Sequence, residues 1–305
     1  MKSINKFIGA IIGSALGDAI GQMAFLLPER EALIDAIDKA QELIYTDDTA
    51  MSIALMEVVI EEGEVDCEKI GRNFSIHYKK EPWRGYASGP PTIFKMVENE
   101  GISYREASKR IYGGQGSYGN GAAMRIAPIG VYFHDSPDLY DIVRESAICT
   151  HSHPIGIDGA AVQAKAISIA FELDPNRGFS EMEFLNKIIE FSRTDEMKER
   201  LNLIGKALNE RWDDKEALRA FGGGVSVLES LPFSLFCFLR YGNSFERCLW
   251  CSVLNGGDRD TMGAMACAIS GAYVGIKNIR DDWKIKLENF SRIQELMMKL
   301  WHMNR

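Results

Sequence analysis

Apolar residues recur every three or four positions along most of this chain, the spacing of one face of an α-helix. This pattern predicts helices at about 4–25, 33–43, 51–62, 66–80, 180–220, 228–239, 245–254 and 262–273. Alternating patterns typical of strands are nearly absent. The sequence therefore predicts an all-α fold with short irregular pieces.

The first predicted helix carries a glycine at every fourth position: Gly9, Gly13, Gly17 and Gly21. Glycine is costly inside a helix, so such a stripe predicts that another backbone packs closely against it. A dimerising membrane helix shows the same spacing, but Asp18 on this segment argues against it. No run reaches the roughly 18 to 20 uncharged apolar residues of a membrane span, and a signal peptide is the less favoured interpretation of the N-terminus.

Two acidic motifs stand at the start of predicted helices. Thr46-Asp47-Asp48-Thr49 precedes one helix, and Asp258-Arg259-Asp260-Thr261 precedes another far later in the chain. Neighbouring ionised carboxylates repel each other and resist burial, so four of them need a positive partner. Asp and Thr oxygens are hard ligands that suit Mg²⁺, Mn²⁺ or Ca²⁺. The motifs therefore predict one shared metal site.

An alternative interpretation is that these residues are ordinary helix caps. Asp48 or Thr49, and Asp260 or Thr261, can accept hydrogen bonds from free N–H groups and complement the helix dipole. A cap needs one such residue, whereas each motif provides three or four. The metal site is the favoured interpretation.

A glycine-rich segment, 112–121, lies near the middle of the chain, with Tyr112 and Tyr118 within it. Glycines let successive N–H groups converge on an anion, and aromatic rings offer a face for a base. The segment thus suggests a nucleotide diphosphate site, although a plain flexible loop has a similar composition. His151 precedes Pro154 and an alanine-rich helix, a second place for an anion, but a lone histidine is more often structural.

Length and composition limit the choice of function. The 305 residues contain no stretch of linker composition, so a single domain spanning 1–305 is expected. The net charge of −8 and the lack of a basic run argue against nucleic-acid binding. The six cysteines mostly lie in apolar helical runs, including Cys248 and Cys251, and indicate buried free thiols and a cytoplasmic location.

Taken together, these motifs resemble those of the ADP-ribosylglycohydrolase family, also called the dinitrogenase-reductase-activating glycohydrolase family. The matching segments occur in the family's order: 17–21, 45–49, 116–121 with 123–125, 150–151, 229–232, 256–261 and 271–273. Each is weak alone, and the ordered set is specific. The segments 116–121 and 229–232 are most similar to the branch that removes ADP-ribose from serine and cleaves O-acetyl-ADP-ribose or poly(ADP-ribose).

The resemblance implies a compact orthogonal bundle of helices with two Mg²⁺ or Mn²⁺ ions at the base of an ADP-ribose cleft. The first ion would be held by Thr46, Asp47, Asp48 and Asp260. The second would be held by Asp258, Asp260 and Thr261, with Asp260 bridging. Asp47, Asp48 and Asp260 are also the candidate catalytic groups.

The resemblance also implies the residues that contact ADP-ribose. The loop would receive the diphosphate and the distal ribose, with His151 as a further contact and Tyr112 stacking on the adenine. Tyr118 would close over the nucleoside. The predicted ADP-ribose contacts are Tyr112, Gly116, Ser117, Tyr118, Gly119, Asn120, Gly121 and His151.

One position departs from the serine-linked branch. That branch has a glutamate eight residues after the first glycine of Gly-Asp-x-x-Gly, and here the position is Phe25, with Glu29 the nearest acid downstream. The expected function is metal-dependent hydrolysis of the C1″ glycosidic bond of an ADP-ribosyl group, on a modified protein or on O-acetyl-ADP-ribose. The alternatives are an ADP-ribose-binding protein with little or no turnover and a metal-dependent glycosidase of another substrate class. A monomer is expected, and the linkage is left open.

Overall fold

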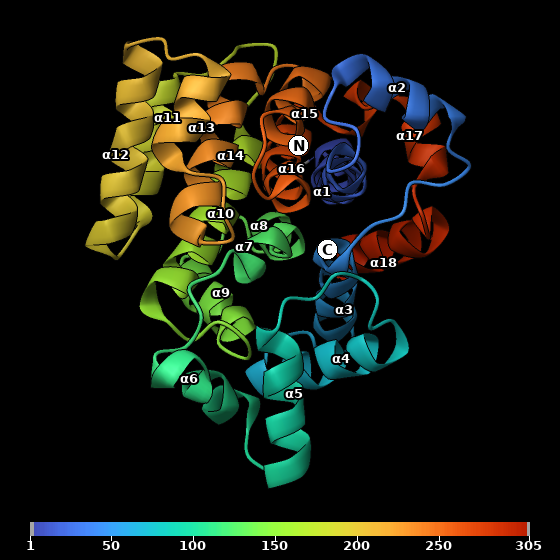
Figure 1. The fold of residues 1–305 in the computed structure, drawn as a ribbon, viewed down its shortest axis with the longest axis vertical. Helices are drawn as coiled ribbons and strands as arrows, with labels where there is room; N and C mark the ends of the chain where they lie inside the picture. Colours follow the sequence, from blue (N-terminus) through green and yellow to red (C-terminus); the bar gives the residue numbers. More distant parts are fainter. Residues whose placement is uncertain (1–2, 304–305) are drawn as a thin grey trace.

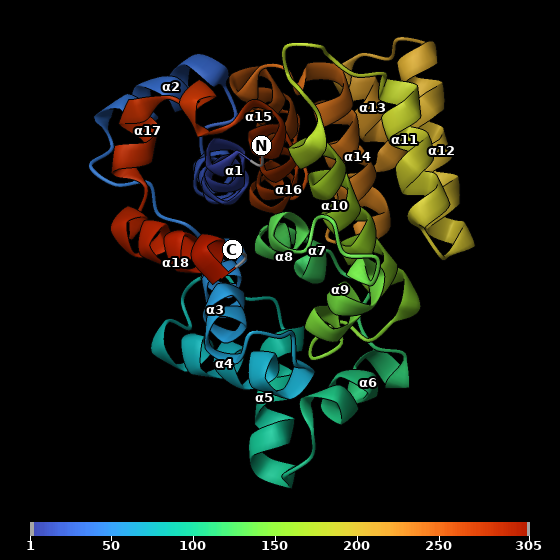
Figure 2. The same ribbon diagram turned by 180° about the vertical axis from the view of Figure 1, so that it is seen from behind.

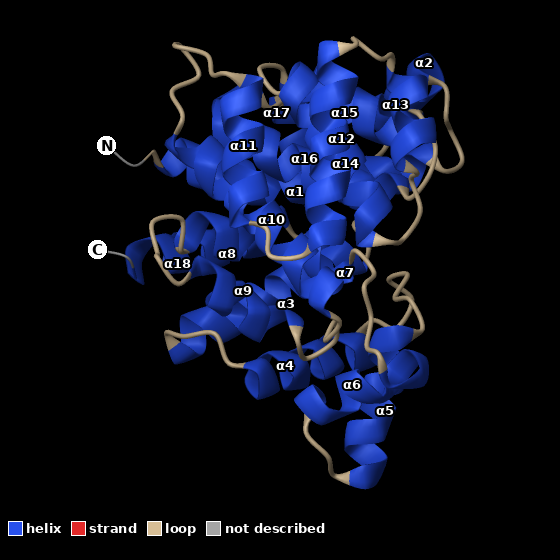
Figure 3. Ribbon diagram, turned by 90° about the vertical axis from the view of Figure 1, so that its left-hand side faces the viewer, coloured by secondary structure: helices blue, strands red, loops and turns tan. Residues whose placement is uncertain are grey.

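The computed structural model describes residues 3–303, and these residues are almost entirely helical. They form eighteen α-helices and one 3-10 helix, and no strand occurs among them. Two isolated β-bridges, Leu43 with Leu287 and Gly119 with Ser226, are the only extended pairings in this part of the chain. The all-α prediction is confirmed (Figure 3).

The helices follow one another with short connections. The first nine are α1 Ile4–Ala24, α2 Arg30–Lys39, α3 Asp47–Glu62, α4 Cys67–Lys80, α5 Gly89–Glu100, α6 Tyr104–Gly114, α7 Gly121–Met124, α8 Ala127–Tyr132 and α9 Leu139–Ala147. The others are α10 Pro154–Glu172, α11 Glu181–Phe191, α12 Asp195–Asn209, α13 Asp214–Phe221, α14 Val227–Tyr241, α15 Phe245–Leu254, α16 Arg259–Val274, the 3-10 helix Ile276–Asn278, α17 Asp281–Lys286 and α18 Phe290–Met303.

Helices α1 and α16 form the central pair of the fold. They lie side by side in Figures 1 and 2, surrounded by other helices. The glycine stripe of α1 makes this contact: a Cβ added at Gly9, Gly17 or Gly21 would overlap the backbone of Gly271, Gly263 or Arg259 on α16. The predicted close approach of a second backbone is confirmed, and it fixes the start of α16 relative to α1.

Most of the remaining helices form two groups, which lie on either side of the central α1–α16 pair. Helices α11 to α14 pack beside α10 and α16 in one group, and α4 to α6 form the far end of the other, with α3 leading into it (Figure 1). Helix α3 also contacts α1 and α16. This arrangement brings the N-termini of α3 and α16, which carry the two acidic motifs, to the same region of the molecule.

Several helix ends differ from the sequence-based expectation. The predicted helix 33–43 ends at Lys39, because the chain then turns extended and Leu43 pairs with Leu287. The helical region 180–220 is three helices, α11 to α13, each preceded by a Ser, Thr or Asp at the N-cap position. Helix α3, by contrast, ends at Glu62 as predicted, and Gly63 follows it with a φ of 73° that a glycine adopts without strain.

Helix α1 is long and apolar enough to cross a membrane by length and composition alone. However, 83% of its most apolar stretch is buried inside the protein, which is the environment of a core helix. All six cysteines are buried free thiols, and Cys248 and Cys251 lie on α15 within the core, as the sequence predicted. The cytoplasmic location stays a prediction.

Candidate active site

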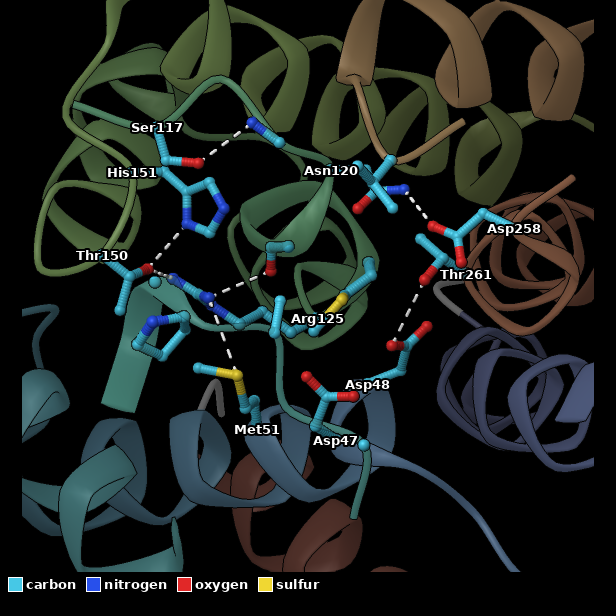
Figure 4. Close-up of a pocket in the computed structure, with 18 of the residues that line it drawn as sticks. Asp47, Asp48, Met51, Ser117, Asn120, Arg125, Thr150, His151, Asp258 and Thr261 are labelled. Atoms are coloured by element: carbon cyan, nitrogen blue, oxygen red, sulfur yellow. Dashed lines mark hydrogen bonds between the residues drawn. The ribbon is translucent and has the colours of Figure 1, made fainter. Parts of the chain in front are cut away.

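A cavity of about 190 Å³ lies where the two acidic motifs meet the glycine-rich loop (Figure 4). Its walls come from the starts of α3 and α16, the loop before α7, and the turns before α5, α10 and α14. The lining residues are Asp47, Asp48, Met51, Gly85, Ala87, Gly89, Pro90, Tyr112, Ser117, Gly119, Asn120, Gly121, Met124, Arg125, Thr150, His151, Val225, Asp258, Asp260 and Thr261.

The first acidic motif is held in place by Asp18, a fully buried residue of α1. The N–H and hydroxyl of Thr46 donate to Asp18 Oδ1 at 3.0 and 2.8 Å, and those of Thr49 donate to Oδ2 at 3.0 and 2.6 Å. These four hydrogen bonds use free donors at the start of α3. They fix the direction in which Asp47 and Asp48 leave the backbone.

A buried arginine supports the same turn from the other side. The guanidinium of Arg84 donates to the carbonyl of Tyr45 at 2.9 Å and to both carboxylate oxygens of Glu288, at 2.5 and 2.8 Å. The carbonyl of Arg84 accepts a hydrogen bond from the Asp47 N–H at 2.8 Å. Residue 84 therefore positions Asp47 through the main chain.

The second acidic motif begins α16, with Asp258 at the N-cap position. The N–H of Asp258 donates to the Gly223 carbonyl at 2.7 Å. The hydroxyl of Thr261 donates to Asp48 Oδ1 at 3.4 Å, so the two motifs touch across the cavity floor (Figure 4). The structure thus brings together two segments that the sequence separates widely.

Burial and mutual repulsion act strongly on these carboxyls. Burial, together with the charges of Asp18 and Asp258, raises the pKa of Asp47 to about 7. Burial raises the pKa of Asp48 well above its usual range, with Asp18 and Asp260 contributing. Burial and the charge of Asp258 raise the pKa of Asp260 to about 8. Like charges in a dry site explain this pattern.

These residues fit a hard divalent cation by their chemistry. Asp48 Oδ2 is buried and has no hydrogen-bond partner among the described residues, an unusual state for a carboxylate. A cation would supply the missing partner and reverse the rise in pKa. In residues 3–303 no three His, Cys, Asp or Glu side chains already stand in a complete metal-binding group. The oxygen atoms of the two acidic motifs therefore have the chemistry that a divalent cation site needs.

The glycine-rich loop is pinned between two other segments. Gly119 forms a β-bridge with Ser226, and the backbone carbonyl of Tyr118 accepts a hydrogen bond from the Val227 N–H at 3.1 Å. Ser117 Oγ accepts from the Gly119 N–H at 3.1 Å. The loop is therefore an ordered wall of the cavity rather than a free linker.

Asn120 joins this loop to the second acidic motif. Its side-chain amide donates to Asp258 Oδ2 at 2.6 Å and to Ser230 Oγ at 3.1 Å. The resemblance to the family implied Asn120 as an ADP-ribose contact. The structure places its Nδ2 on protein acceptors, which makes it a support for Asp258 as well as a lining residue.

Tyr112 and Tyr118 stand at the outer part of the site. Tyr112 is 59% exposed and lines the cavity from a backbone with φ 53°, an uncommon value for a residue with a side chain. Tyr118 is 48% exposed and packs its ring 5.1 Å from that of His153, outside the cavity wall. Both rings are available to a ligand that extends out of the cavity.

His151 lies on the cavity wall, as the sequence suggested, but its surroundings were not foreseen. Its Nδ1 is 2.8 Å from the Thr150 hydroxyl, which also accepts from Arg125 at 2.8 Å. Burial, together with the nearby charge of Arg125, lowers the pKa of His151 to about 3. A single arginine within the apolar run 122–131 was the available signal for Arg125.

Some residues that the sequence drew attention to lie off the cavity. Three of them are predicted ligands or ADP-ribose contacts: Thr46, Gly116 and Tyr118. Thr46 holds the first acidic motif through its hydrogen bond to Asp18, and Gly116 and Tyr118 belong to the glycine-rich loop. Phe25 is 44% exposed just after α1, and Glu29 is exposed before α2. Neither lines the cavity, so Glu29 does not take the place of the glutamate of the serine-linked branch in this structure.

Comparison with known proteins identifies the family of this chain. The ADP-ribosylglycohydrolase family model matches residues 1–305. The chain belongs to the ADP-ribosylglycohydrolase family. The resemblance that the sequence motifs suggested is therefore confirmed.

Individual members of the family are clearly similar. ADP-ribosylhydrolase ARH3 of mouse is 32% identical over 86% of this chain and 78% of its own length, and the human protein is 32% identical over 86% and 80%. A solved structure titled ADP-ribosylglycohydrolase-related protein complex superposes with a TM-score of 0.76 at 22% identity, over 100% of this chain and 99% of that one. It shows the shared fold. The family and its ARH3 members support ADP-ribosyl hydrolysis as the activity.

Proposed function

We propose that this protein hydrolyses the C1″ glycosidic bond of an ADP-ribosyl group with Mg²⁺ or Mn²⁺ as cofactor. The observation that carries the proposal is the meeting of two acidic helix starts at the floor of a cavity whose wall is the glycine-rich loop. Acids at the base and backbone donors at the rim suit a substrate with a sugar at one end and a diphosphate in the middle.

The two acidic motifs would hold the cations. Asp47, Asp48 and Asp260 would form one site, and Asp258, Asp260 and Thr261 the other. The resemblance also implies Thr46 at the first site, where its hydroxyl lies behind the cavity and donates to Asp18. When bound, such cations would anchor sugar hydroxyls and lower the pKa of a water molecule. The buried, unpartnered Oδ2 of Asp48 supports this assignment.

The cavity accommodates only part of the substrate. Its volume of about 190 Å³ is below the roughly 300 to 1,000 Å³ of pockets that enclose a whole ligand. The ribose to be cleaved would lie deep, near Asp47 and Asp258, with the diphosphate against the loop 117–121. The adenine would extend to the rim, where the exposed ring of Tyr112 can stack on it.

In the proposed reaction the protein orients the substrate and the attacking water, stabilises the charge that develops on the sugar, and accepts a proton. A water oxygen forms a bond to C1″ while the C1″ bond to the acceptor breaks, and the bonding electrons stay on the leaving atom, which takes up a proton. Positive charge develops on the sugar, and the carboxylates of Asp47 and Asp48 stabilise it. Either carboxylate can accept the proton that the attacking water loses.

The substrate is the ADP-ribosyl group of a modified protein or of O-acetyl-ADP-ribose. This choice rests on the similarity to ARH3 and on the segments 116–121 and 229–232. Phe25 stands where the serine-linked branch has a glutamate, so arginine-linked, serine-linked and O-acetyl substrates are all candidates.

A second candidate function follows from Phe25. A protein that binds ADP-ribose in this cleft without hydrolysing a glycosidic bond would need the loop, Tyr112 and His151. It would not need the glutamate that Phe25 replaces. A panel of arginine-linked, serine-linked and O-acetyl substrates, assayed with Mg²⁺ and with chelator, separates the two. Release of ADP-ribose from any substrate supports the hydrolase. Tight ADP-ribose binding by calorimetry with no release from any of them supports the binding protein.

A further inference from the structure

Arg125 is a fully buried cation without a carboxylate in ion-pair contact among the described residues. It is 1% exposed, and its guanidinium lies 4.5 Å from the ring of Phe74. It donates to the carbonyl of Gly121 at 3.0 Å, the carbonyl of Ser146 at 3.3 Å and the hydroxyl of Thr150 at 2.8 Å. Burying an unpaired charge is expensive, so a role beyond packing is expected for it.

The hydroxyl of Thr150 is the second member of this chain of contacts. A guanidinium can only donate, so Thr150 Oγ1 must accept from Arg125. The hydroxyl has one proton of its own, and the acceptors near it are His151 Nδ1 at 2.8 Å, the Ala147 carbonyl at 3.5 Å and the thiol of Cys149, a weaker acceptor. Of the nitrogen and oxygen acceptors, the nearer is Nδ1. If His151 Nδ1 instead donated to Thr150 Oγ1, the hydroxyl proton of Thr150 would lose this near acceptor. The Ala147 carbonyl, at 3.5 Å, lies at the limit of hydrogen bonding.

The ring of His151 is thereby fixed from behind. When Nδ1 accepts, a neutral imidazole carries its proton on Nε2. This nitrogen lies beside the glycine-rich loop: a Cβ added at Gly121 or Gly119 would come to 3.0 or 3.5 Å from it. The structure gives Nε2 no protein acceptor among the described residues, and His151 lines the cavity (Figure 4).

We propose that Arg125 and Thr150 are positioning residues that hold His151 as the neutral Nε2–H tautomer, which presents one hydrogen-bond donor to an acceptor oxygen of the bound nucleotide. The nature of that ligand, a phosphate or sugar oxygen of an ADP-ribosyl group, rests on the proposed function. The arrangement of the three side chains does not. Glycines at 119 and 121 leave the ring nitrogen accessible.

A neutral donor behaves differently from a cationic histidine. Arg125 is the charged group that acts on His151, and Arg125 itself interacts with Asp47 and Cys149. Its buried positive charge opposes a second one on the adjacent ring. His151 therefore donates without titrating over the neutral range, while Arg125 provides the constant positive field behind it.

The tautomer can be observed directly in the ligand-free protein. Long-range ¹H–¹⁵N spectra of protein with ¹⁵N-labelled histidine distinguish Nδ1–H, Nε2–H and imidazolium forms. The signal of His151 among the five histidines is identified by its loss in His151→Gln. The expected result is the Nε2–H form, unprotonated from pH 8 to 5. An Nδ1–H form, or protonation near the usual histidine pKa of about 6.5, overturns the proposal.

Variants of Thr150 test the positioning role. Thr150→Val keeps the shape and removes the hydroxyl, so a mixture of tautomers and an ADP-ribose affinity lower by about 10-fold or more are expected. Thr150→Ser should retain both wild-type properties. Loss of affinity in Thr150→Val with an unchanged tautomer overturns the positioning role. If Thr150→Val does not fold, Arg125→Lys, which keeps the charge without the guanidinium fork, takes its place with the same two readouts.

The outcome also separates this inference from the proposed function. A wild-type protein with the Nε2–H tautomer that binds no ADP-ribose supports the side-chain arrangement and overturns the proposed function. A protein that binds and hydrolyses an ADP-ribosyl substrate while His151 titrates near its usual pKa supports the proposed function and overturns the inference.

Discussion

The side-chain amide of Asn120 donates a 2.6 Å hydrogen bond to Asp258 Oδ2, and this bond joins the loop of the glycine-rich wall to the acidic floor. The same amide reaches Ser230 Oγ at 3.1 Å. Residues proposed for two different tasks, nucleotide binding and cation binding, are thereby connected through one side chain. A ligand that moves the loop must also act on Asp258.

Replacing Asn120 by Ala should therefore weaken cation binding, although Asn120 is not itself a proposed ligand. Partners that orient a metal ligand typically contribute about 10- to 100-fold in affinity. Titration of Mn²⁺ into the protein measures this directly. Ser230→Ala, which removes only the second contact of the amide, is the matched control and should change the affinity little. Equal Mn²⁺ affinity in wild type and Asn120→Ala would contradict the assignment.

Replacing Asp48 by Asn should lower activity and raise the stability of the metal-free protein. The substitution removes a buried carboxyl whose ionisation burial and the neighbouring carboxyls oppose, and it keeps an acceptor at Oδ1 for Thr261. We expect a loss of about 100-fold or more in kcat/KM and a melting temperature in chelator higher by about 2–6 °C. Added Mg²⁺ should raise the melting temperature of the wild type more than that of the variant.

Asp66 provides the contrast for an ordinary helix cap. It accepts from the Lys69 N–H at 2.9 Å at the start of α4, away from the cavity. Asp66→Ala should cost about 1 kcal/mol of stability with no change in kcat/KM. If Asp48→Asn keeps the activity and the Mg²⁺ response of the wild type, as Asp66→Ala should, then the first acidic motif is only a cap, because Asn caps a helix about as well as Asp.

Replacing Asp18 by Ala should unfold or strongly destabilise the protein. Four donors from Thr46 and Thr49 would lose their acceptor in a fully buried site, with an expected loss of about 3–5 kcal/mol. Urea denaturation in chelator measures the loss without a contribution from bound metal. A change below about 1 kcal/mol would show that Asp18 does not hold the start of α3.

The Glu57 carboxyl should contribute stability that depends on pH. Burial alone would raise its pKa, but hydrogen bonds from His77, Asn73 and Arg292 outweigh burial and lower the pKa to about 2. The folded-state pKa is depressed, so the contribution is complete above the unfolded value of about 4.3 and is lost as pH falls toward about 2. Glu57→Gln should show a shallower loss of stability over this range, followed by urea denaturation at each pH.

Tyr112 should contribute to binding through its ring rather than its hydroxyl. Stacking on a base typically contributes about 1–3 kcal/mol, so Tyr112→Ala should weaken ADP-ribose binding by roughly 5- to 150-fold. Tyr112→Phe should bind nearly as well as the wild type. Calorimetry with ADP-ribose measures both. Equal losses in the two variants would show that the hydroxyl, which lies near Gly89, carries the contact.

The central helix pair could be predicted from the sequence because a glycine stripe has a direct physical meaning. Each of Gly9, Gly17 and Gly21 proved to lie against backbone of α16. The acidic motifs were predictable for a similar reason, since adjacent carboxylates at helix starts need a partner. Their approach to each other depended on how α1 and α16 pack, which periodicity alone does not give.

The supporting residues were harder to find because their partners lie far away along the chain. Asp18 accepts from residues about 30 positions later, and Arg125 reaches Thr150. A signal existed in both cases: each is a single charged residue within an apolar segment, and such a residue must have hydrogen-bond partners when buried. The identity of those partners required the structure.

The most direct test of the central claim is the release of ADP-ribose from a panel of ADP-ribosylated substrates, measured with Mg²⁺, with chelator, and after Mg²⁺ is restored. The account predicts release from at least one substrate, loss of release in chelator, and recovery on restoration, with no recovery in Asp48→Asn. Release that is unaffected by chelator, or no release from any substrate despite ADP-ribose binding, would contradict it.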